Sequence, residues 1–421
     1  MSTLIVFLNS ERIGSLEQDE SGLLQFSYDP AWLEKPGAAP LSRSLPLRSE
    51  VFTGRKVRPF FAGILPEEEP RRNIAKILGI SDTNDFAMLA RIGGECAGAV
   101  SLLPEGTAPS IPESAERREL TEPEIQQIVA ELPHRPLMVG TDGLRLSLAG
   151  AQDKLPVIVH GNGISLPLDG MPSTHILKPE PDRFPGLAAN EMFCMALAAA
   201  VGLNVPKTEY RPVGEKPCIL VKRYDRKTDE DGGTTRIHQE DFCQAMGFPP
   251  ERKYQTEGGP MLRDCISLLR DWSTVPVLDI PAFINSLIFN VLIGNADAHG
   301  KNYSLLYSGG EQRLSPFYDL VSTLAWPELS KNLAMKIGGC ESVSAFTIGD
   351  WKKMAGKAGL GWPMIRERMA EISQAMLNEL DTVRKQTREC NGEVAKRLHE
   401  IIGNRSARML EALSSDRSFP S

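Results

Sequence analysis

The densest group of polar side chains in the sequence is NADAHGKN, from Asn295 to Asn302, directly after the apolar segment FINSLIFNVLIG. Asp297 and Asn302 stand five positions apart, which is the D-x-x-x-x-N spacing of a catalytic loop for phosphoryl transfer. In such a loop the carboxylate takes the proton from an attacking hydroxyl, and the amide oxygen is a hard ligand for Mg²⁺. The pair therefore indicates phosphoryl transfer; for the two residues taken alone, a turn or a helix cap is the alternative.

Three further residues stand where this chemistry needs them. Asp319, in LSPFYDLVST, follows Asp297 by 22 positions and is placed as a second Mg²⁺ ligand. Lys178 ends the alternating segment THILKP and can hold the phosphates of ATP; a surface lysine at a strand end is the alternative. Glu191 lies early in the next helical segment, where it can orient Lys178 or, alternatively, be an exposed acid favoured by the helix dipole.

A loop of small residues, LRLSLAGAQDK, precedes Lys178 and carries a lone serine, Ser147. Its backbone N–H groups can bind an anion, but the absence of G-x-x-x-x-G-K-[ST] argues against a P-loop NTPase. A hydrolase built on Ser147, His299 and Asp297 is disfavoured because no G-x-S-x-G surrounds the serine; His299 is expected to order its loop. Downstream, CILVKRYDR ends in Tyr224 and Asp225, a candidate hinge for adenine and ribose or, alternatively, a solvated charged turn.

The elements that must position these residues are of two kinds. Short alternating segments predict strands in residues 1–105 and 139–238, with a helix over 67–80 and another over 187–203. Residues 104–122, rich in Pro, Ser and Glu, predict a linker, and nearly all of the chain after residue 239 reads as helix. We therefore predict an α+β, two-lobed protein-kinase-like fold, whose lobes would enclose a nucleotide cleft. Its expected parts are a β-rich N-terminal subdomain (1–105), a linker and helix (106–138), a small β-rich N-lobe with the phosphate-binding loop (139–238) and a larger all-helical C-lobe (239–421).

Composition narrows the classes of protein. With 421 residues, 41% hydrophobic and 24% charged, the chain is ordinary for a globular protein, and its net charge of −7 argues against coating nucleic acid. The seven cysteines form no C-x-x-C pair and the six histidines no H-E-x-x-H spacing, so we expect neither a disulfide framework nor a structural zinc. The start lacks the features of a signal peptide, and the apolar run Met192–Leu203 is too short to span a bilayer. A cytoplasmic protein without a membrane partner is expected.

A series of segments also follows the order found in one family: LSLAGAQDK, THILKP, NEMFCMALAAAVGLNVP, VKRYDR, HQEDFCQAMG, KYQTEGGP, NADAHGKN and LSPFYDL. Over essentially its whole length the chain resembles HipA-type proteins, the serine/threonine kinase toxins of HipBA toxin–antitoxin modules. One departure is DAHGKN where DGHAKN is commoner, which exchanges Ala298 and Gly300 and moves the flexible position by two residues.

The resemblance implies a role for each candidate residue. Asp297 would be the catalytic base, Asn302 and Asp319 the Mg²⁺ ligands, and Ser147 a serine that the protein phosphorylates on itself. ATP would be bound by a larger set: Ala149, Gly150, Ala151, Gln152, Asp153, Lys154, Lys178, Tyr224, Asp225, His299 and Lys301.

The resemblance also implies partners. A HipB-type helix-turn-helix antitoxin would neutralise the kinase, and operator DNA would be reached mainly through that antitoxin. The protein substrate would be a translation component such as glutamyl-tRNA synthetase, whose phosphorylation would arrest growth. The alternative is a catalytically quiet corepressor that bridges antitoxin and operator. The family's operator complex and the basic segments RREL and RKQTR favour this alternative.

Overall fold

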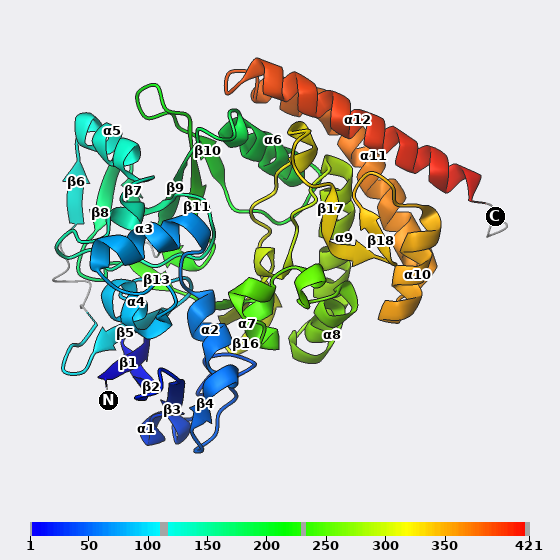
Figure 1. Ribbon diagram of the computed structural model, residues 1–421. Coiled ribbons are helices and arrows are strands. Elements are labelled where there is room, and N and C mark those ends of the chain that lie inside the picture. Colours follow the sequence, from blue (N-terminus) through cyan, green and yellow to red (C-terminus); the bar gives the residue numbers. More distant parts are fainter. Residues whose placement is uncertain (1, 110–116, 229–232, 417–421) are drawn as a thin grey trace. The chain divides into compact units, whose positions relative to one another are not determined.

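The computed structural model describes residues 2–109, 117–228 and 233–416. The chain divides into two compact units, shown together in Figure 1. The first unit comprises Met1–Pro181, Arg211–Pro250 and Ser304–Gln312, and the second comprises Asp182–Tyr210, Glu251–Tyr303 and Arg313–Ser421. Helices and strands occur in both units, so the predicted α+β class is confirmed.

The first sheet of the first unit is antiparallel, with the strand order β4-β3-β2-β1-β5. Its strands are β1 (Ser2–Leu8), β2 (Glu11–Gln18), β3 (Leu24–Tyr28), β4 (Phe52–Thr53) and β5 (Val100–Pro104). Alternation places Leu4, Val6 and Leu8 of β1 in the large core, while Ile5 and Phe7 form a small cluster with Leu103 on the other face. The strand pattern of residues 1–105 is thus confirmed for this sheet.

Short helices accompany this sheet: α1 (Pro30–Leu33), α2 (Arg58–Gly63), α3 (Glu68–Leu78) and α4 (Asp85–Ile92). The helix predicted over 67–80 is α3, which ends where Gly79 adopts a φ of 66°. The buried carboxylate of Asp85 joins α4 to its neighbours, because it pairs with Arg58 at 2.7 Å and with Arg71 at 2.6 Å.

In the second sheet of the first unit, strands follow the order β11-β9-β7-β8-β6. They are β6 (Arg117–Leu120), β7 (Leu155–His160), β8 (Gly163–Pro167), β9 (His175–Pro179) and β11 (Cys218–Lys222). The linker predicted over 104–122 is wrong at its end, because residues 117–120 pair antiparallel with β8 as an edge strand. Residues 110–116 of that stretch lie outside the described residues. The helix α5 (Glu122–Glu131) then begins with the capping box of Thr121 and Glu124.

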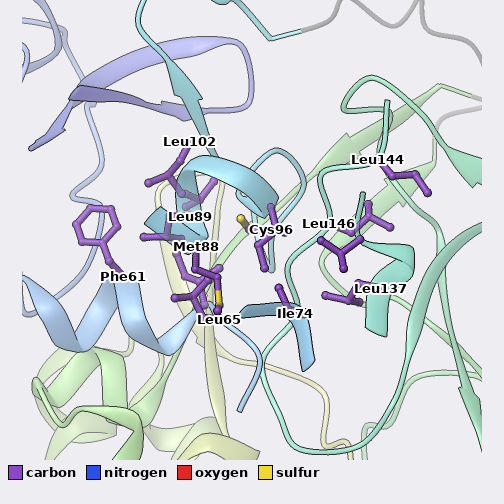
Figure 2. Packing of buried hydrophobic residues seen from close by; sticks show 14 of the residues in the cluster. Phe61, Leu65, Ile74, Met88, Leu89, Cys96, Leu102, Leu137, Leu144 and Leu146 are labelled. Carbon is purple, nitrogen blue, oxygen red and sulfur yellow. The ribbon is translucent and has the colours of Figure 1, made fainter. Parts of the chain in front are cut away.

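One hydrophobic core is continuous through both sheets, from Leu4 to Leu220. Figure 2 shows part of it: Phe61 of α2, Met88 of α4 and Leu102 of β5 lie toward the left of the view, and Leu137 and Leu146 of the same cluster lie at the right. The N-terminal sheet and the sheet that carries Lys178 therefore share one hydrophobic core. The first unit is completed by short elements: β12 (Arg226–Thr228), β13 (Thr234–Arg236), β14 (His238–Asp241), α7 (Phe242–Met246) and β15 (Ser304–Ser308).

The second unit is mainly helical. Its central helix α9 (Pro276–Ile293) contacts α8 (Leu262–Trp272), α11 (Trp362–Gln386) and α12 (Gly392–Ser415). Helix α11 also contacts α6 (Leu187–Ala200). In Figure 1 the long helix α12 lies alongside α11. Within the described residues, α9 is the one helix long and apolar enough to cross a membrane, and 67% of that stretch is buried inside the unit, as in the core helix of a globular protein.

The region after residue 239 is helical for the most part and not throughout. It also contains β15, β16 (Glu311–Leu314) and the hairpin of β17 (Asn332–Ile337) and β18 (Cys340–Ser342). The remaining elements of the second unit are β10 (Thr208–Tyr210) and α10 (Ile348–Ala358). Short strands of three to six residues between turns were missed because the long apolar helices around them dominate the pattern.

Candidate functional site

The loop that carries Ser147 lies in the first unit and is held along the N-terminal strands and helices. Leu146 forms a parallel bridge with Glu95, and Gly150 forms another with Pro66. The Ser147 N–H donates to the Glu95 carbonyl at 2.9 Å. These backbone bonds hold the loop in an extended form on both sides of the serine.

The Ser147 side chain is fully buried, at 0% exposure. Its hydroxyl donates to the carbonyl of Ile64 at 3.1 Å. A hydroxyl in this position is out of reach of any phosphoryl donor, so phosphorylation of Ser147 requires the loop to leave this conformation.

The second half of the loop folds back on itself. The Lys154 ammonium donates to the Ala149 carbonyl at 2.7 Å. Gly150 has a φ of 109°, a backbone conformation that side chains other than glycine rarely adopt, so this position favours glycine. Burial and the nearby Glu69 carboxylate raise the pKa of Asp153 to about 6, which makes its charge sensitive near neutral pH.

Gln152 joins this loop to the strand of Lys178, because its amide donates to the Pro179 carbonyl at 3.4 Å. Lys178 lies on β9 between β7 and β11, opposite Ile219, and is only 6% exposed. The alternative of a surface lysine at a strand end is therefore wrong. A lysine is almost never buried without a specific role, because its charge is costly to desolvate.

Asp225 occupies a different environment from the one expected of a ribose contact. It is 2% exposed, and its carboxylate pairs with Arg223 at 2.7 Å and with Arg226 at 3.0 Å. It also accepts the N–H of Gly98 at 2.7 Å. The two guanidinium groups outweigh the cost of burial and hold the pKa of Asp225 well below its usual range. A carboxylate saturated in this way has a structural role, so both readings of Asp225, ribose contact and solvated turn, are unsupported by the geometry.

The second acid that pairs with these two arginines is Glu95, which was not singled out in the sequence. Its carboxylate is 3.1 Å from Arg223 and 2.5 Å from Arg226, and all three side chains are buried. The alternating charges of KRYDR were the available signal, but nothing local pointed to an acid more than a hundred residues upstream. Tyr224, next to Asp225, is partly buried and donates its hydroxyl to Gln239 at 2.5 Å.

In the second unit, the predicted catalytic loop begins where α9 ends. Gly294 adopts a φ of 75°, and a Cβ there would lie 2.6 Å from a Leu324 side-chain carbon, so the turn needs glycine. The Asn295 side chain accepts the Asp297 N–H at 2.9 Å. Asp297 itself is exposed, and its Oδ1 accepts the hydroxyl of Tyr254 at 2.8 Å.

The rest of this loop orients Asn302. The amide oxygen of Asn302 accepts the His299 N–H at 3.1 Å, and the Asn302 N–H donates to the His299 carbonyl at 3.0 Å. Tyr318 donates its hydroxyl to the Lys301 carbonyl at 2.8 Å. His299 is buried and its ring meets that of Tyr254 edge to face, with the centroids 5.3 Å apart. The expected role of His299 in ordering the loop stays a prediction, and the sequence did not single out Tyr254 or Tyr318.

The segment of Asp319 is fastened to the same loop. Thr323 makes the connection, because its hydroxyl donates to the Gly294 carbonyl at 3.1 Å and accepts the Ala296 N–H at 3.0 Å. Asp319 adopts a φ of 55°, a conformation that costs energy in a residue other than glycine and that is concentrated at functional sites. The structure thus brings the backbone segments of Asp297, Asn302 and Asp319 together in the second unit.

Helix α6 anchors the same segment from the other side. Asn190 accepts the Ser322 N–H at 2.8 Å and donates to the Ser322 carbonyl at 3.1 Å. Its neighbour Glu191 is 2% exposed, so the alternative of an exposed acid in the first turn is wrong. Asp297, His299, Lys301, Asn302, Asp319 and Glu191 belong to the second unit, while the loop of Ser147, Lys178, Tyr224 and Asp225 belong to the first.

The donor set fits Mg²⁺ better than a transition metal. Among the described residues no group of three or more His, Cys, Asp or Glu side chains is placed to hold a metal ion. Asn302 and Asp319 offer hard oxygen atoms, and Mg²⁺ is usually bound by one or two such side chains together with substrate phosphates and water.

Comparison with known proteins places this arrangement in a family. Residues 146–382 match the HipA-like C-terminal domain, and residues 4–103 match the HipA N-terminal domain. The chain belongs to the HipA family. All candidate site residues lie within the C-terminal match, and the strands β1 to β5 fall almost entirely within the N-terminal one.

Individual relatives agree. The chain is 47% identical to a Sinorhizobium fredii protein named "Putative kinase Y4mE", over 88% of this chain and 89% of the relative. It is 31% identical to the serine/threonine-protein kinase toxin HipA of Shewanella oneidensis, over 86% and 84% respectively. HipA in the structure of the Shewanella oneidensis HipA, HipB and operator DNA complex matches with a TM-score of 0.87 at 26% identity, over 99% of this chain and 100% of that chain. The family assignment and the kinase-like fold follow from these matches.

Proposed function

We propose that this HipA-family protein is a serine/threonine protein kinase that uses ATP and Mg²⁺. The observation that carries the proposal is the loop after α9. There the carboxylate of Asp297 is exposed, Asn302 is oriented by the backbone of His299, and Thr323 ties the segment of Asp319 to the same turn. A base and two hard oxygen ligands on one rigid framework are the elements that phosphoryl transfer requires.

In this proposal each side chain of the second unit has one task. Asp297 accepts the proton of the attacking hydroxyl, and the hydrogen bond from Tyr254 fixes the orientation of its carboxylate. Asn302 and Asp319 hold Mg²⁺, which when bound neutralises charge on the phosphates. Lys178 and the backbone of residues 149–154 bind the phosphates of ATP, and Tyr224 contacts the adenine. Asp225 is assigned a structural role instead.

We further propose that Ser147 is the site of self-inactivation. Its burial supports this, because a phosphate brings a charge of about −1.5 to −2 into a buried position where the hydroxyl faces the Ile64 carbonyl, itself a hydrogen-bond acceptor. Phosphorylated Ser147 would not return to this pocket. The loop of residues 149–154 would then be held away from the position in which it binds phosphates.

The partners are proposed from the family. The Shewanella oneidensis relative is a kinase toxin whose structure contains HipB and operator DNA, so we propose a HipB-type antitoxin for this chain. The net charge of −7 supports leaving most DNA contacts to that antitoxin. The protein substrate is proposed to be a translation component, an aminoacyl-tRNA synthetase such as glutamyl-tRNA synthetase.

The test is phosphoryl transfer from labelled ATP by dephosphorylated wild type and by Asp297→Asn. Loss of the base should lower transfer to Ser147 and to substrate by about 10²–10⁴-fold, the usual contribution of a general base. Binding of Mg²⁺·ATP should persist in the variant. A wild-type protein that binds Mg²⁺·ATP and transfers nothing would rule out the kinase. If Asp297→Asn then still repressed its operator, and overexpressed wild type did not arrest growth, the quiet corepressor would be the better function.

A further inference from the structure

A cavity of about 650 Å³ lies within the first unit, apart from the proposed nucleotide site. It is bounded by the turn after β1, by residues 139–145 and by β13. None of the residues proposed above to bind ATP or to carry the chemistry lines it. Its volume is in the range of small-molecule sites, roughly 300–1,000 Å³.

One buried side chain in its wall, Arg236, has an unusual environment. Arg236 is 7% exposed and donates to the Ser101 hydroxyl at 3.1 Å and to the Gly170 carbonyl at 2.5 Å. Within the described part of the chain its Nε has no hydrogen-bond partner and its guanidinium makes no ion pair. A buried cation of this kind is costly unless an anion compensates it.

The neighbouring charges do not compensate Arg236. The buried cluster behind it holds two carboxylates, Glu95 and Asp225, and these already pair with Arg223 and Arg226. Arg236 is the third guanidinium beside two acids, so the cluster carries one excess positive charge. Burial, together with Arg226 and Arg223, lowers the pKa of Arg236 to about 10 despite the attraction of Glu95; it stays protonated at neutral pH.

A second guanidinium without an acid lines the same cavity. Among the residues that the structure describes, Arg145 donates only to the carbonyls of Ala90, Arg91 and Leu102, at 2.9 to 3.3 Å. The two acids in the wall, Asp142 and Asp169, are exposed and make no ion pair among the described residues. A third arginine of the wall, Arg91, is exposed as well. Because exposed charges are screened by solvent, Arg236 and Arg145 dominate the field inside.

The remaining wall is partly apolar, with Val139, Leu144 and Leu103 among its residues; Leu144 is labelled in Figure 2. We propose that this cavity binds a small organic anion, with a carboxylate or phosphate group at Arg236 and Arg145 and an apolar body against this wall. Arginine suits both anions because its planar donors match their oxygen atoms.

The test uses the full-length protein with saturating Mg²⁺ and a non-hydrolysable ATP analogue, so that the proposed nucleotide site is filled. Phenyl phosphate and benzoate are the probes, benzyl alcohol is the uncharged control, and binding is measured by calorimetry and ligand-observed NMR. At least one anion should bind, at least tenfold more tightly than the alcohol. The anion that binds more tightly identifies whether the natural group is a phosphate or a carboxylate.

Arg236→Met and Arg145→Met should each weaken that binding at least tenfold. Arg48→Met is the matched control. Among the described residues Arg48 also donates to backbone carbonyls and to no acid, lies in the same unit and does not line the cavity; binding of the anion to this variant should be unchanged. If Arg236→Met fails to fold, Arg145→Met and the comparison of anion with alcohol on wild type still decide. The proposal is overturned if neither anion binds wild type, if the alcohol binds as well, if the arginine variants bind normally, or if the ATP analogue displaces the anion. None of these outcomes depends on kinase activity.

Discussion

At the scale of single residues, exposure and partners separate two aspartates that the sequence had placed in one site. Asp297 is exposed and accepts one hydroxyl, whereas Asp225 is buried between two guanidinium groups. The first can receive a proton from a substrate. The second cannot leave its partners without exposing two buried cations.

Tyr254→Phe isolates the hydroxyl that orients Asp297. The phenyl ring keeps its edge-to-face contact with His299, while the hydrogen bond of 2.8 Å to Asp297 is removed. We expect kcat to fall roughly 3- to 10-fold, because a hydrogen bond to a charged group at an exposed site is worth about 1 kcal/mol. The KM for ATP should be unchanged. Steady-state kinetics would contradict this if the variant lost no activity or if only KM rose.

Asp225→Asn tests the structural role. Removing the carboxylate charge leaves Arg223 and Arg226 undercompensated in a buried site, which should lower the free energy of unfolding by about 3–5 kcal/mol. Urea denaturation measures this, with the exposed Asp82→Asn as control, expected to change stability by less than about 0.5 kcal/mol. A stable Asp225→Asn protein with a raised KM for ATP would instead support Asp225 as a contact of the ribose.

At the scale of elements, the site depends on how α9, α6 and the segment after β16 are fastened. The long apolar helix α9 ends at Gly294, and the loop that follows is held by Thr323 as well as by bonds among its own residues. Asn190 of α6 then holds Ser322. Positioning of Asp319, with its strained backbone, therefore comes from a neighbouring helix.

Asn190→Ala should loosen that connection. The buried N–H and carbonyl of Ser322 lose their partners, so we expect a loss of about 2–3 kcal/mol of stability and a weaker affinity for Mg²⁺. Calorimetric Mg²⁺ titration and urea denaturation measure the two effects. Asn378→Ala, which removes an exposed side-chain bond to Gln374 on α11, is the control. Equal behaviour of the two variants would show that Asn190 positions nothing.

At the scale of the whole molecule, the first unit joins distant parts of the chain around a buried acid. Glu240 of β14 accepts the Arg43 N–H at 2.9 Å and the hydroxyls of Ser42 and Tyr307. Burial raises the pKa of Glu240 to about 7, and burial lowers that of the adjacent His238 to about 4. The N-terminal segment, β14 and β15 thus meet at two titratable groups that are both favoured in their neutral forms.

These two shifts change the stability of the first unit in opposite directions with pH, so their effects largely cancel between about pH 4.5 and 6.5. Because the folded pKa of Glu240 exceeds its ordinary value of 4.5, its contribution is present below pH 4.5 and is lost as pH rises through 7. A shift of this size corresponds to about 3 kcal/mol. His238 acts in the opposite sense, since its contribution is present above pH 6.5 and is lost as pH falls toward 4.

Hydrogen exchange of the β14 and β15 amides between pH 5 and 8, corrected for intrinsic exchange, measures this dependence. Glu240→Gln should remove most of the loss on the alkaline side, because the amide does not ionise. Glu341→Gln, which changes an exposed acid of the second unit, should leave the profile of these strands as in wild type. A Glu240→Gln profile identical to wild type would contradict the assignment.

The local spacing of residues in the sequence determined the fold class and the main candidate residues of this protein. The periodicity of α3, α9 and α11, the glycine after α9 and the D-x-x-x-x-N spacing depend on residues within a few turns of one another, so the sequence alone indicated the α+β class and the loop chemistry. The edge strand β6 was not predicted, because a segment of three charged residues and one leucine forms a strand only when β8 pairs with it.

Only the tertiary structure decided which charged groups are available. Glu95 and Arg223 are separated by 128 residues along the chain yet form one buried network. That network argues against Asp225 as part of the proposed nucleotide site, and it leaves Arg236 as an excess positive charge. Ser147 is likewise buried because Ile64 lies across from it. Burial and ion pairing depend on residues far apart in the chain, so they cannot be predicted from a local sequence pattern.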